Sequence, residues 1–255
     1  GHHRRQRQMC IRDRSSTVET RNPDESPLVG LAEEEFWPVL RVSFPAKPFP
    51  NSQLGHLFEG DNSAQQYISE ISGGDSQLTT TIVGDTWASP YAESHWGTDS
   101  DAERDTGADS GGVRELAREA IISTFSGPNW GQNLDISQWD LDGDFIIDRL
   151  LILHSGQPQE EGGPSTSIWS HFSYFYEPVE VGEYTIEHYT MASVHGGLGV
   201  LVHEMLHQMG AIDLYDVHSD SPTRNWHGLG DWDVMASGNW VDAVSYTHLR
   251  AHETR

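Results

Sequence analysis

Apolar residues follow two different spacings along the chain, and each spacing predicts one kind of secondary structure. Short stretches rich in β-branched and aromatic residues, in which apolar side chains alternate or run together, predict strands. These stretches cover residues 36–44, 78–83, 149–154 and 184–191. Apolar residues three and four positions apart predict helices at 63–71 and 112–125, and a further helix begins after Gly196-Gly197. The mixture of strands and helices predicts one α/β domain with its own core.

Three of the predicted strands carry more specific information. Pro38 lacks an N–H group and indicates an edge position for the strand at 36–44. The run from Arg149 to His154 is apolar without alternation, which is typical of a strand buried on both faces of a sheet. The strand at 184–191 alternates, and we expect it to form an edge that can pair with an extended peptide.

The sequence HEMLH at 203–207 is the most informative motif of the chain. On a helix, residues four positions apart lie on one face, so His203 and His207 can bind one metal ion together. Glu204 then projects beside the metal, where its carboxylate can take a proton from water. An apolar run precedes the motif, and Gly210 follows it where a helix must end. These flanks favour a zinc site over two solvated histidines on a surface helix.

A catalytic zinc site usually has a third protein ligand and keeps one open position. Gly210 can turn the chain through the left-handed region of backbone conformations, and this turn can direct Asp213 back toward the metal. We expect Asp213 to be the third ligand, with Asp216 as the alternative. If Asp213 is the ligand, Asp216 can instead orient one of the imidazoles.

A second group of acidic residues precedes the strand at 149–154. Its carboxylates lie at alternating positions, a spacing that can surround one Ca²⁺ ion in a tight loop. The residues are Asp140, Asp142 and Asp144, with Asp148 four positions further on. Phe145 stands where an EF-hand loop has glycine and Leu151 where it has glutamate, so the loop is not an EF-hand. We expect a structural calcium site here, and the alternative is an acidic turn that binds no ion.

Several motifs together resemble the immune inhibitor A family of secreted bacterial zinc metalloproteases, which are metzincin-like zincins. The resemblance is carried by HEMLHQMGAIDLYD (203–216), GDWDVMASGNW (230–240), WDLDGDFIIDRLLILHSGQPQE (139–160), IWSH (168–171) and, more loosely, YISEISGG (67–74). It implies a zincin-like α+β fold with a twisted mixed sheet, a backing helix and an active-site helix that carries HExxH. By the same resemblance, Met235 would be the methionine turn beneath the zinc, a buried residue that touches no metal.

The resemblance further implies a secreted endopeptidase with protein or peptide substrates, one catalytic zinc, a propeptide and further C-terminal domains. Glu204 would be the general base for the water that attacks the peptide bond. Two other classes remain open: a non-peptidase zinc hydrolase with the same ligands, and a catalytically silent binding module stabilised by calcium. The intact HExxH motif favours an enzyme over the silent module.

The two ends of the chain differ in character from the rest. Residues 1–14 and 243–255 are basic and lack hydrophobic patterning, and they resemble translated sequencing adapters. Residues 15–35 are polar and acidic, which is typical of a linker or the tail of a propeptide. The predicted catalytic domain therefore covers residues 36–242, and we expect it to be truncated at its C-terminal end.

The charge balance excludes two classes of partner. The chain has 39 Asp and Glu against 15 Lys and Arg, a formal net charge of -24 at pH 7, and such a surface repels nucleic acid and anionic membranes. No apolar run is long enough to span a membrane. The only cysteine, Cys10, lies in the basic leader, so we expect the domain to have no disulfide bonds.

Other residues are open to two interpretations. His171 can line a cleft or pack as a structural histidine beside Trp169. His154 ends an apolar strand, which favours a buried imidazole with hydrogen-bond partners. Ser155 and Ser193 have histidines nearby in the sequence, but no Ser-His-Asp arrangement can be recognised from spacing alone. We therefore predict no serine nucleophile.

Overall fold

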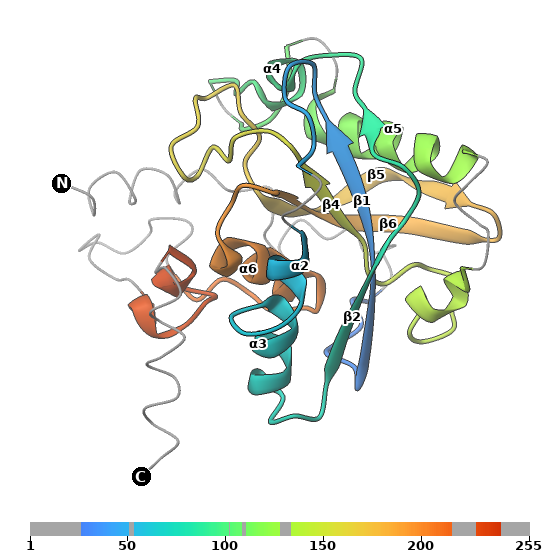
Figure 1. Cartoon of the computed structure of the whole chain (residues 1–255), viewed down its shortest axis with the longest axis vertical. Coiled ribbons are helices and arrows are strands. Elements are labelled where there is room, and N and C mark those ends of the chain that lie inside the picture. Colours follow the sequence, from blue (N-terminus) through green and yellow to red (C-terminus); the bar gives the residue numbers. More distant parts are fainter. Residues whose placement is uncertain are drawn as a thin grey trace.

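The computed structural model describes residues 27–50, 54–101, 103–108, 111–127, 134–215 and 228–240, and in this part of the chain six strands form one mixed sheet (Figure 1). The strands are β1 (Glu34–Ser43), β2 (Gln77–Ile82), β3 (Trp87–Ala88), β4 (Leu151–His154), β5 (His171–Val181) and β6 (Tyr184–Ser193). Their order is β2-β1-β4-β6-β5, and the short β3 pairs with β1. All pairs are parallel except β5 and β6, which form an antiparallel hairpin. The predicted α/β class with a mixed sheet is confirmed.

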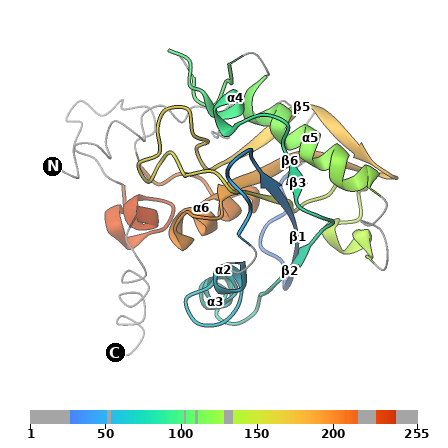
Figure 2. The ribbon, with the colours of Figure 1, turned by 45° about the horizontal axis from the view of Figure 1, so that its top comes forward.

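Helices cover both faces of the sheet (Figure 2). They are α2 (Leu54–Phe58), α3 (Ala64–Ile71), α4 (Glu93–Gly97), α5 (Gly112–Ser126) and α6 (Leu198–Gln208), with short 3₁₀ turns η2 (Ile136–Trp139), η3 (Gly230–Trp232) and η4 (Ser237–Trp240). Helix α5 lies on one face, and α2, α3 and α6 lie on the other. A backing helix and a helix with the HExxH motif thus flank the sheet, as in a zincin-like α+β fold.

The two faces of the sheet bury two separate hydrophobic cores, because side chains alternate along a strand. On β1, Leu40 and Val42 belong to the core that α5 covers. Trp37 and Val39 belong to the opposite core, which includes residues of α2, α3 and α6. All four side chains are buried. The helix with the metal motif therefore packs against the sheet through a core that it does not share with α5.

Most predicted elements are observed within about two residues of their expected ends. The helix predicted at 63–71 is α3, with Ser63 as its N-cap. The helix predicted at 112–125 is α5, and the helix after the glycine pair is α6, with Gly197 as its N-cap. The apolar run at 149–154 is the central strand β4, which is buried at every residue.

Pro38 does not mark an edge strand, and this prediction is wrong. Strand β1 lies inside the sheet, between β2 and β4. Its pairing with β4 begins at Val39, whereas Pro38 lies opposite Thr81 of β2. The Val39 carbonyl accepts the Val83 N–H, so the backbone groups of Val39 point toward β2. The backbone groups of Pro38, one residue earlier, point toward β4. They lie just before the first residue of β1 that pairs with β4. The missing N–H of this proline therefore costs no hydrogen bond.

The prediction that 184–191 forms an edge is also wrong, because β6 lies between β4 and β5. The edge next to β6 is β5, a strand that the sequence pattern does not reveal. Its ladder with β6 changes register between Tyr174 and Val179, around Pro178, and such irregularities are typical of edge strands.

A buried ion pair joins the segment before β4 to β1. Arg149 and Glu35 are both fully buried. The guanidinium donates from Nε to Glu35 Oε2 at 2.7 Å and from Nη2 to Oε1 at 3.0 Å, and Trp37 Nε1 donates to the same Oε2 at 2.8 Å. This bidentate contact is the geometry that best offsets the free-energy cost of burying a charge pair.

Arg149 also binds main-chain carbonyls from three other places. Nη2 donates to Val29 and Gly30, at 3.0 and 2.9 Å, ahead of β1. Nη1 donates to the Asp148 carbonyl at 3.2 Å and to the Gln208 carbonyl at 3.3 Å. Since Gln208 is the last residue of α6, one side chain holds together the segment before β1, the end of the acidic loop and the helix of the metal motif.

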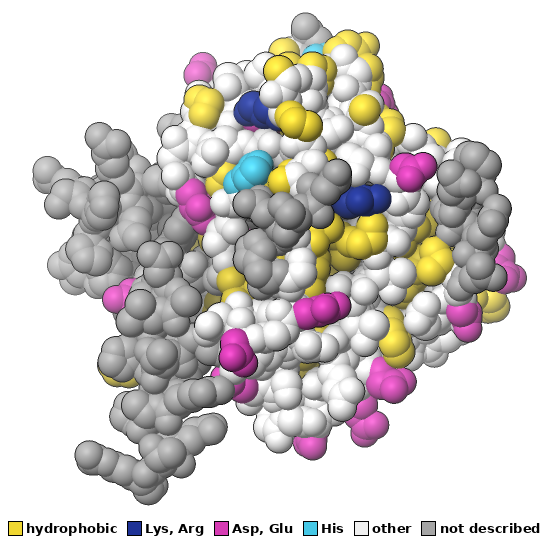
Figure 3. All heavy atoms as spheres, viewed as in Figure 1, with side chains coloured by type: hydrophobic (Ala, Val, Ile, Leu, Met, Phe, Trp, Pro, Cys, Tyr) yellow, Lys and Arg dark blue, Asp and Glu magenta, His cyan; other side chains and the backbone are white. Residues whose placement is uncertain are grey.

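The described surface agrees with the acidic composition. On the face shown in Figure 3, Asp and Glu side chains lie scattered over the described surface, and Lys and Arg side chains are sparse. Across the described ranges, no helix combines the length and apolar character needed to cross a bilayer.

The predicted division into domains stays a prediction. The end segments 1–14 and 243–255 lie outside the described residues, as does the first part of the segment 15–35. Strand β1 begins at Glu34, so the last two residues of that segment belong to the sheet.

We expect Glu35→Gln to lower the free energy of unfolding by about 3–5 kcal/mol, because the buried Arg149 cation would lack its counter-ion. Urea unfolding followed by tryptophan fluorescence measures this change. Glu177→Gln is the control: its carboxylate lies 3.9 Å from Arg118 and is 89% exposed, so its loss should cost less than about 1 kcal/mol. Equal effects of the two substitutions would contradict the role given to the buried pair.

Candidate metal centre

Helix α6 carries the HExxH motif and ends in a defined turn. At its start, Glu161 accepts the Gly197 N–H at 2.6 Å. At its end, Gly210 has a φ of 89°; its N–H donates to the His207 carbonyl, and the Ala211 N–H donates to the Leu206 carbonyl. These two bonds form a Schellman motif, in which the left-handed residue is usually glycine. The predicted role of Gly210 as the helix terminator is confirmed.

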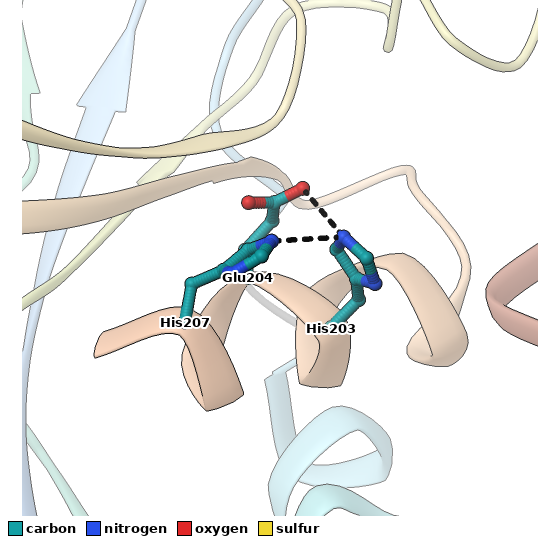
Figure 4. A group of neighbouring side chains, drawn as sticks. All are labelled: His203, Glu204 and His207. Atoms are coloured by element: carbon teal, nitrogen blue, oxygen red, sulfur yellow. Dashed lines mark hydrogen bonds and ion pairs between the residues drawn. The ribbon is translucent and has the colours of Figure 1, made fainter. Parts of the chain in front are cut away.

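The two histidines and the glutamate of the motif lie together and are buried (Figure 4). The Nε2 atoms of His203 and His207 are 3.1 Å apart, and Glu204 Oε1 lies 4.0 Å from His203 Nε2. Beyond the turn, Asp213 brings its Oδ1 within 3.2 Å of His203 Nε2 and 3.3 Å of His207 Nε2. The Asp213 oxygen is therefore closer to the His203 nitrogen than the Glu204 oxygen is.

These three donor atoms form a nearly equilateral triangle, with edges of 3.1, 3.2 and 3.3 Å. A tetrahedral zinc ion with bonds of about 2.0–2.1 Å requires ligand atoms about 3.3–3.4 Å apart, so the triangle has nearly the size of one tetrahedral face. Asp213 Oδ1 is buried and makes no hydrogen bond within the described part of the chain. A buried oxygen without a donor, facing two imidazole nitrogens, fits a cation at this place.

Hydrogen bonds on the outer side of each imidazole fix its orientation. His203 Nδ1 lies 2.8 Å from the Val234 carbonyl, and His207 Nδ1 lies 2.9 Å from the Ala211 carbonyl. Because a carbonyl oxygen only accepts, each Nδ1 carries the proton and each Nε2 presents its lone pair toward Asp213. Metal binding through Nε2 requires this tautomer.

The Asp213 carboxylate is held in its charged form. Burial raises its pKa, but the hydrogen bonds and the positive charge that His203 and His207 supply when protonated outweigh burial and set the pKa well below its usual value. A metal ion binds the ionised form of a carboxylate. The alternative ligand, Asp216, lies outside the described residues, so the choice between the two aspartates stays a prediction.

The edge hairpin orients Glu204. The Phe172 N–H of β5 donates to Glu204 Oε2 at 3.0 Å, and the Thr190 hydroxyl of β6 donates to the Glu204 carbonyl at 3.2 Å. The sequence motifs point to neither residue, because Phe172 acts through its backbone and Thr190 has the character of an ordinary strand residue. The Glu204 carboxylate is thereby fixed beside the imidazoles.

Met235 lies between η3 and η4 and is 5% exposed. Its carbonyl accepts the Leu214 N–H at 2.7 Å, next to Asp213, and the carbonyl of the preceding Val234 binds His203. This segment therefore orients one imidazole and the chain that carries the third candidate ligand. The place of Met235 beneath a metal stays a prediction.

The acidic loop brings three carboxylates together. Asp140, Asp142 and Asp144 each have an oxygen within 4.8 Å of the other two. Asp140 accepts the N–H groups of Gly143, Asp144 and Phe145 at 2.8, 3.1 and 3.0 Å, so the loop folds around this side chain. Phe145 has a φ of 68°, so it adopts a left-handed backbone conformation at the position where an EF-hand loop has glycine.

Asp148 lies outside this group of three carboxylates. It is buried, and its Oδ2 accepts the Leu141 N–H at 2.6 Å. Burial is the largest of the effects that raise the pKa of Asp148 to about 6. The four predicted calcium ligands are thus observed as three neighbouring carboxylates and one separate carboxylate that closes the loop.

The two other histidines singled out in the sequence are buried. His171 Nδ1 lies 2.7 Å from the Trp169 carbonyl, and its Nε2 lies 3.1 Å from the Tyr189 hydroxyl, an arrangement that favours the structural interpretation. His154 Nδ1 accepts the Gly156 N–H at 3.1 Å, whereas Nε2 has no hydrogen bond among the described residues. Burial above all lowers the pKa of His154 to about 3, so this imidazole is neutral.

Comparison with known proteins assigns the chain to a family. The profile described as "Immune inhibitor A peptidase M6, catalytic domain" matches residues 49–254, and the chain belongs to this family. It is 28% identical over 207 residues to Immune inhibitor A of Bacillus thuringiensis subsp. alesti, an alignment that covers 72% of this chain and 29% of that protein.

The chain is also similar to the Pre-pro-metalloprotease PrtV of Vibrio cholerae serotype O1 (strain M66-2). The two are 28% identical over 218 residues, which cover 75% of this chain and 23% of PrtV. The chain thus spans less than a third of the length of these curated relatives. The family resemblance inferred from the motifs is confirmed.

Asp213→Ala should weaken zinc binding by at least about 100-fold, because loss of a ligand should cost more than loss of a residue that only orients one. Competition with a chromophoric zinc chelator measures the affinity. Asp216→Ala is the matched comparison and should weaken zinc binding less than Asp213→Ala does, because Asp216 would at most orient an imidazole. The opposite order of the two variants would assign the third ligand to Asp216.

Proposed function

We propose that this chain is the catalytic part of a zinc-dependent endopeptidase with Glu204 as its general base. The observation that carries the proposal is the triangle of His203 Nε2, His207 Nε2 and Asp213 Oδ1, which has nearly the size of a tetrahedral zinc face. The Glu204 carboxylate lies beside that triangle. Membership of a peptidase family supports the same function.

His203, His207 and Asp213 would hold the zinc ion through two neutral donors and one negative donor. When bound in such a set, zinc polarises a substrate carbonyl and lowers the pKa of a water molecule toward neutrality. Three protein ligands leave a fourth position open, as catalytic zinc sites do.

Glu204 moves the proton. Its carboxylate accepts a proton from the attacking water and then delivers that proton to the leaving amine. The Phe172 N–H holds Oε2 at 3.0 Å, which leaves Oε1, the oxygen 4.0 Å from His203 Nε2, to take the proton.

Protein or peptide substrates follow from the same proposal. Because β5 is the edge strand and its Phe172 N–H reaches the Glu204 carboxylate, an extended peptide beside this edge would bring a peptide bond to the base. We also propose, from the family, that the protein is secreted and is made with a propeptide and further C-terminal domains. The net charge of -24 argues against nucleic acid as a partner.

Glu204→Gln should keep zinc bound but lower kcat by about 10²–10⁴-fold, because the amide cannot accept the proton. Casein digestion and zinc content by elemental mass spectrometry measure the two effects. Glu160→Gln is the control: Glu160 is also buried, and burial raises its pKa to about 7, so glutamine resembles its protonated form. Substantial casein cleavage by the Glu204→Gln variant would refute the role of Glu204 as base. If the parent protein cleaves only small esters, the chain would instead be a non-peptidase hydrolase.

We further propose that Asp140, Asp142 and Asp144 bind a structural calcium ion. Their carboxylates lie within 4.8 Å of one another. Burial and the nearby charges of Asp142 and Asp140 raise the pKa of Asp144, which reflects repulsion that a Ca²⁺ ion would relieve. Water and main-chain carbonyls would complete the six to eight oxygen ligands that Ca²⁺ takes.

Calcium chloride added after EGTA treatment should therefore raise Tm, since a ligand that binds only the folded state stabilises it. Asp142→Asn should remove most of this shift, which differential scanning calorimetry measures. Asp61→Asn, at an exposed turn outside the loop, should keep the shift. A shift of equal size in both variants would place any calcium elsewhere.

A further inference from the structure

Glu204 is held at two points by a pair of residues that face each other across the edge hairpin. Phe172 of β5 and Thr190 of β6 are direct partners in the antiparallel ladder. The Phe172 N–H donates to the carboxylate at 3.0 Å, and the Thr190 hydroxyl donates to the Glu204 main-chain carbonyl at 3.2 Å. The side-chain and main-chain ends of the residue are therefore both fixed to one place on the sheet.

The direction of the Phe172 N–H follows from the strand pairing. The Thr190 N–H donates to the Leu150 carbonyl on the β4 side. Residues directly opposite in an antiparallel ladder exchange either both hydrogen bonds or none, so Phe172 and Thr190 exchange none. The Phe172 N–H then points away from β6, toward the free edge, where the Glu204 carboxylate accepts it.

The Thr190 hydroxyl has a second acceptor on the same helix. Thr190 is fully buried, and Gln208 Oε1 lies 3.4 Å from its Oγ1. Gln208 follows Glu204 by one helical turn, so both acceptors lie on one face of α6. The Leu150 N–H also donates to Gln208 Oε1, at 3.2 Å, which orients the amide so that Nε2 donates to His188 Nδ1 at 2.9 Å. This face of α6 is thereby bound to the start of β4 and to β6.

We propose that Thr190 is a positioning residue for peptide hydrolysis, an inference that rests on the proposed role of Glu204 as the base. The hydroxyl fixes the rotation of α6 about its axis and the position of α6 along that axis, both relative to β6. It thereby sets the distance between the Glu204 carboxylate and the Phe172 N–H. Neither of its acceptors is a candidate zinc ligand. Because a displacement of about 1 Å can cost on the order of 100-fold in rate, loss of this one hydroxyl should affect turnover more than zinc binding.

Thr190→Val tests this role, since it keeps the shape of the side chain and removes the hydroxyl. With a quenched-fluorescent peptide as substrate, kcat should fall by about 10- to 100-fold, while KM changes by less than about twofold. Zinc content should match that of the parent protein. In a crystal structure of the variant, the distance from Phe172 N to Glu204 Oε2 should exceed the 3.0 Å of the parent.

Two matched variants separate positioning from packing. Thr190→Ser keeps the hydroxyl and should restore most of the lost kcat. Thr124→Val removes the hydroxyl of a buried threonine on α5, on the opposite face of the sheet, and should leave kcat unchanged. A folded Thr190→Val with parent kcat, an equal loss in Thr190→Ser, or a rise in KM alone would overturn the proposal.

Folding and the proposed function are tested separately. If Thr190→Val does not fold, Thr190→Ala removes the same hydroxyl with less bulk and carries the same expectation. Failure of both to fold, with Thr190→Ser folded, would assign the hydroxyl to stability and overturn the proposal. If Glu204→Gln loses activity but folded Thr190→Val does not, this inference alone is wrong. If Glu204→Gln stays active, the proposed base is wrong, and the inference about its positioning falls with it.

Discussion

The buried guanidinium of Arg149 is the constraint on which the placement of α6 against the sheet depends. Removing this charge from water costs several kcal/mol, and the chain offsets the cost with the Glu35 carboxylate and with carbonyls from separate segments. A hydrophobic side chain of similar volume could fill the space, but it would not demand one relative position of these segments. The guanidinium demands it, because displacement of any of them leaves a buried donor without an acceptor.

Charge also links the candidate zinc ligands to the proposed base. Two neutral imidazoles and one carboxylate would leave a zinc ion with a net positive charge, which keeps it a strong Lewis acid. A zinc ion bound there would in turn favour the ionised form of Glu204, the form that accepts a proton. The hydrogen bond from Phe172 favours the same form. In the proposed site, the zinc ion would therefore stabilise the charges of both the Asp213 ligand and the Glu204 base.

The sequence was sufficient wherever the determining interactions are local. Helical spacing relates His203 to His207, and a glycine at the helix end accounts for the turn toward Asp213. Strand β5 could not be predicted, because its bulge around Pro178 interrupts the alternation of side chains. The prediction of an edge strand from Pro38 was wrong because the residue at which β1 begins to pair with β4 depends on long-range contacts in the sheet. The contacts that orient Glu204 were also hidden, since they use backbone groups and residues without a motif.

The tripeptide Asp148-Arg149-Leu150 serves two regions at once. Asp148 closes the acidic loop at Leu141, Arg149 binds the Gln208 carbonyl, and the Leu150 N–H binds the Gln208 side chain. Successive side chains of an extended chain point in opposite directions. Inserting or deleting a single residue here would therefore turn these groups away from Leu141 and Gln208 together. Surface loops can absorb changes in chain length, whereas a change in length at these three positions would break the contacts of this chain at both regions.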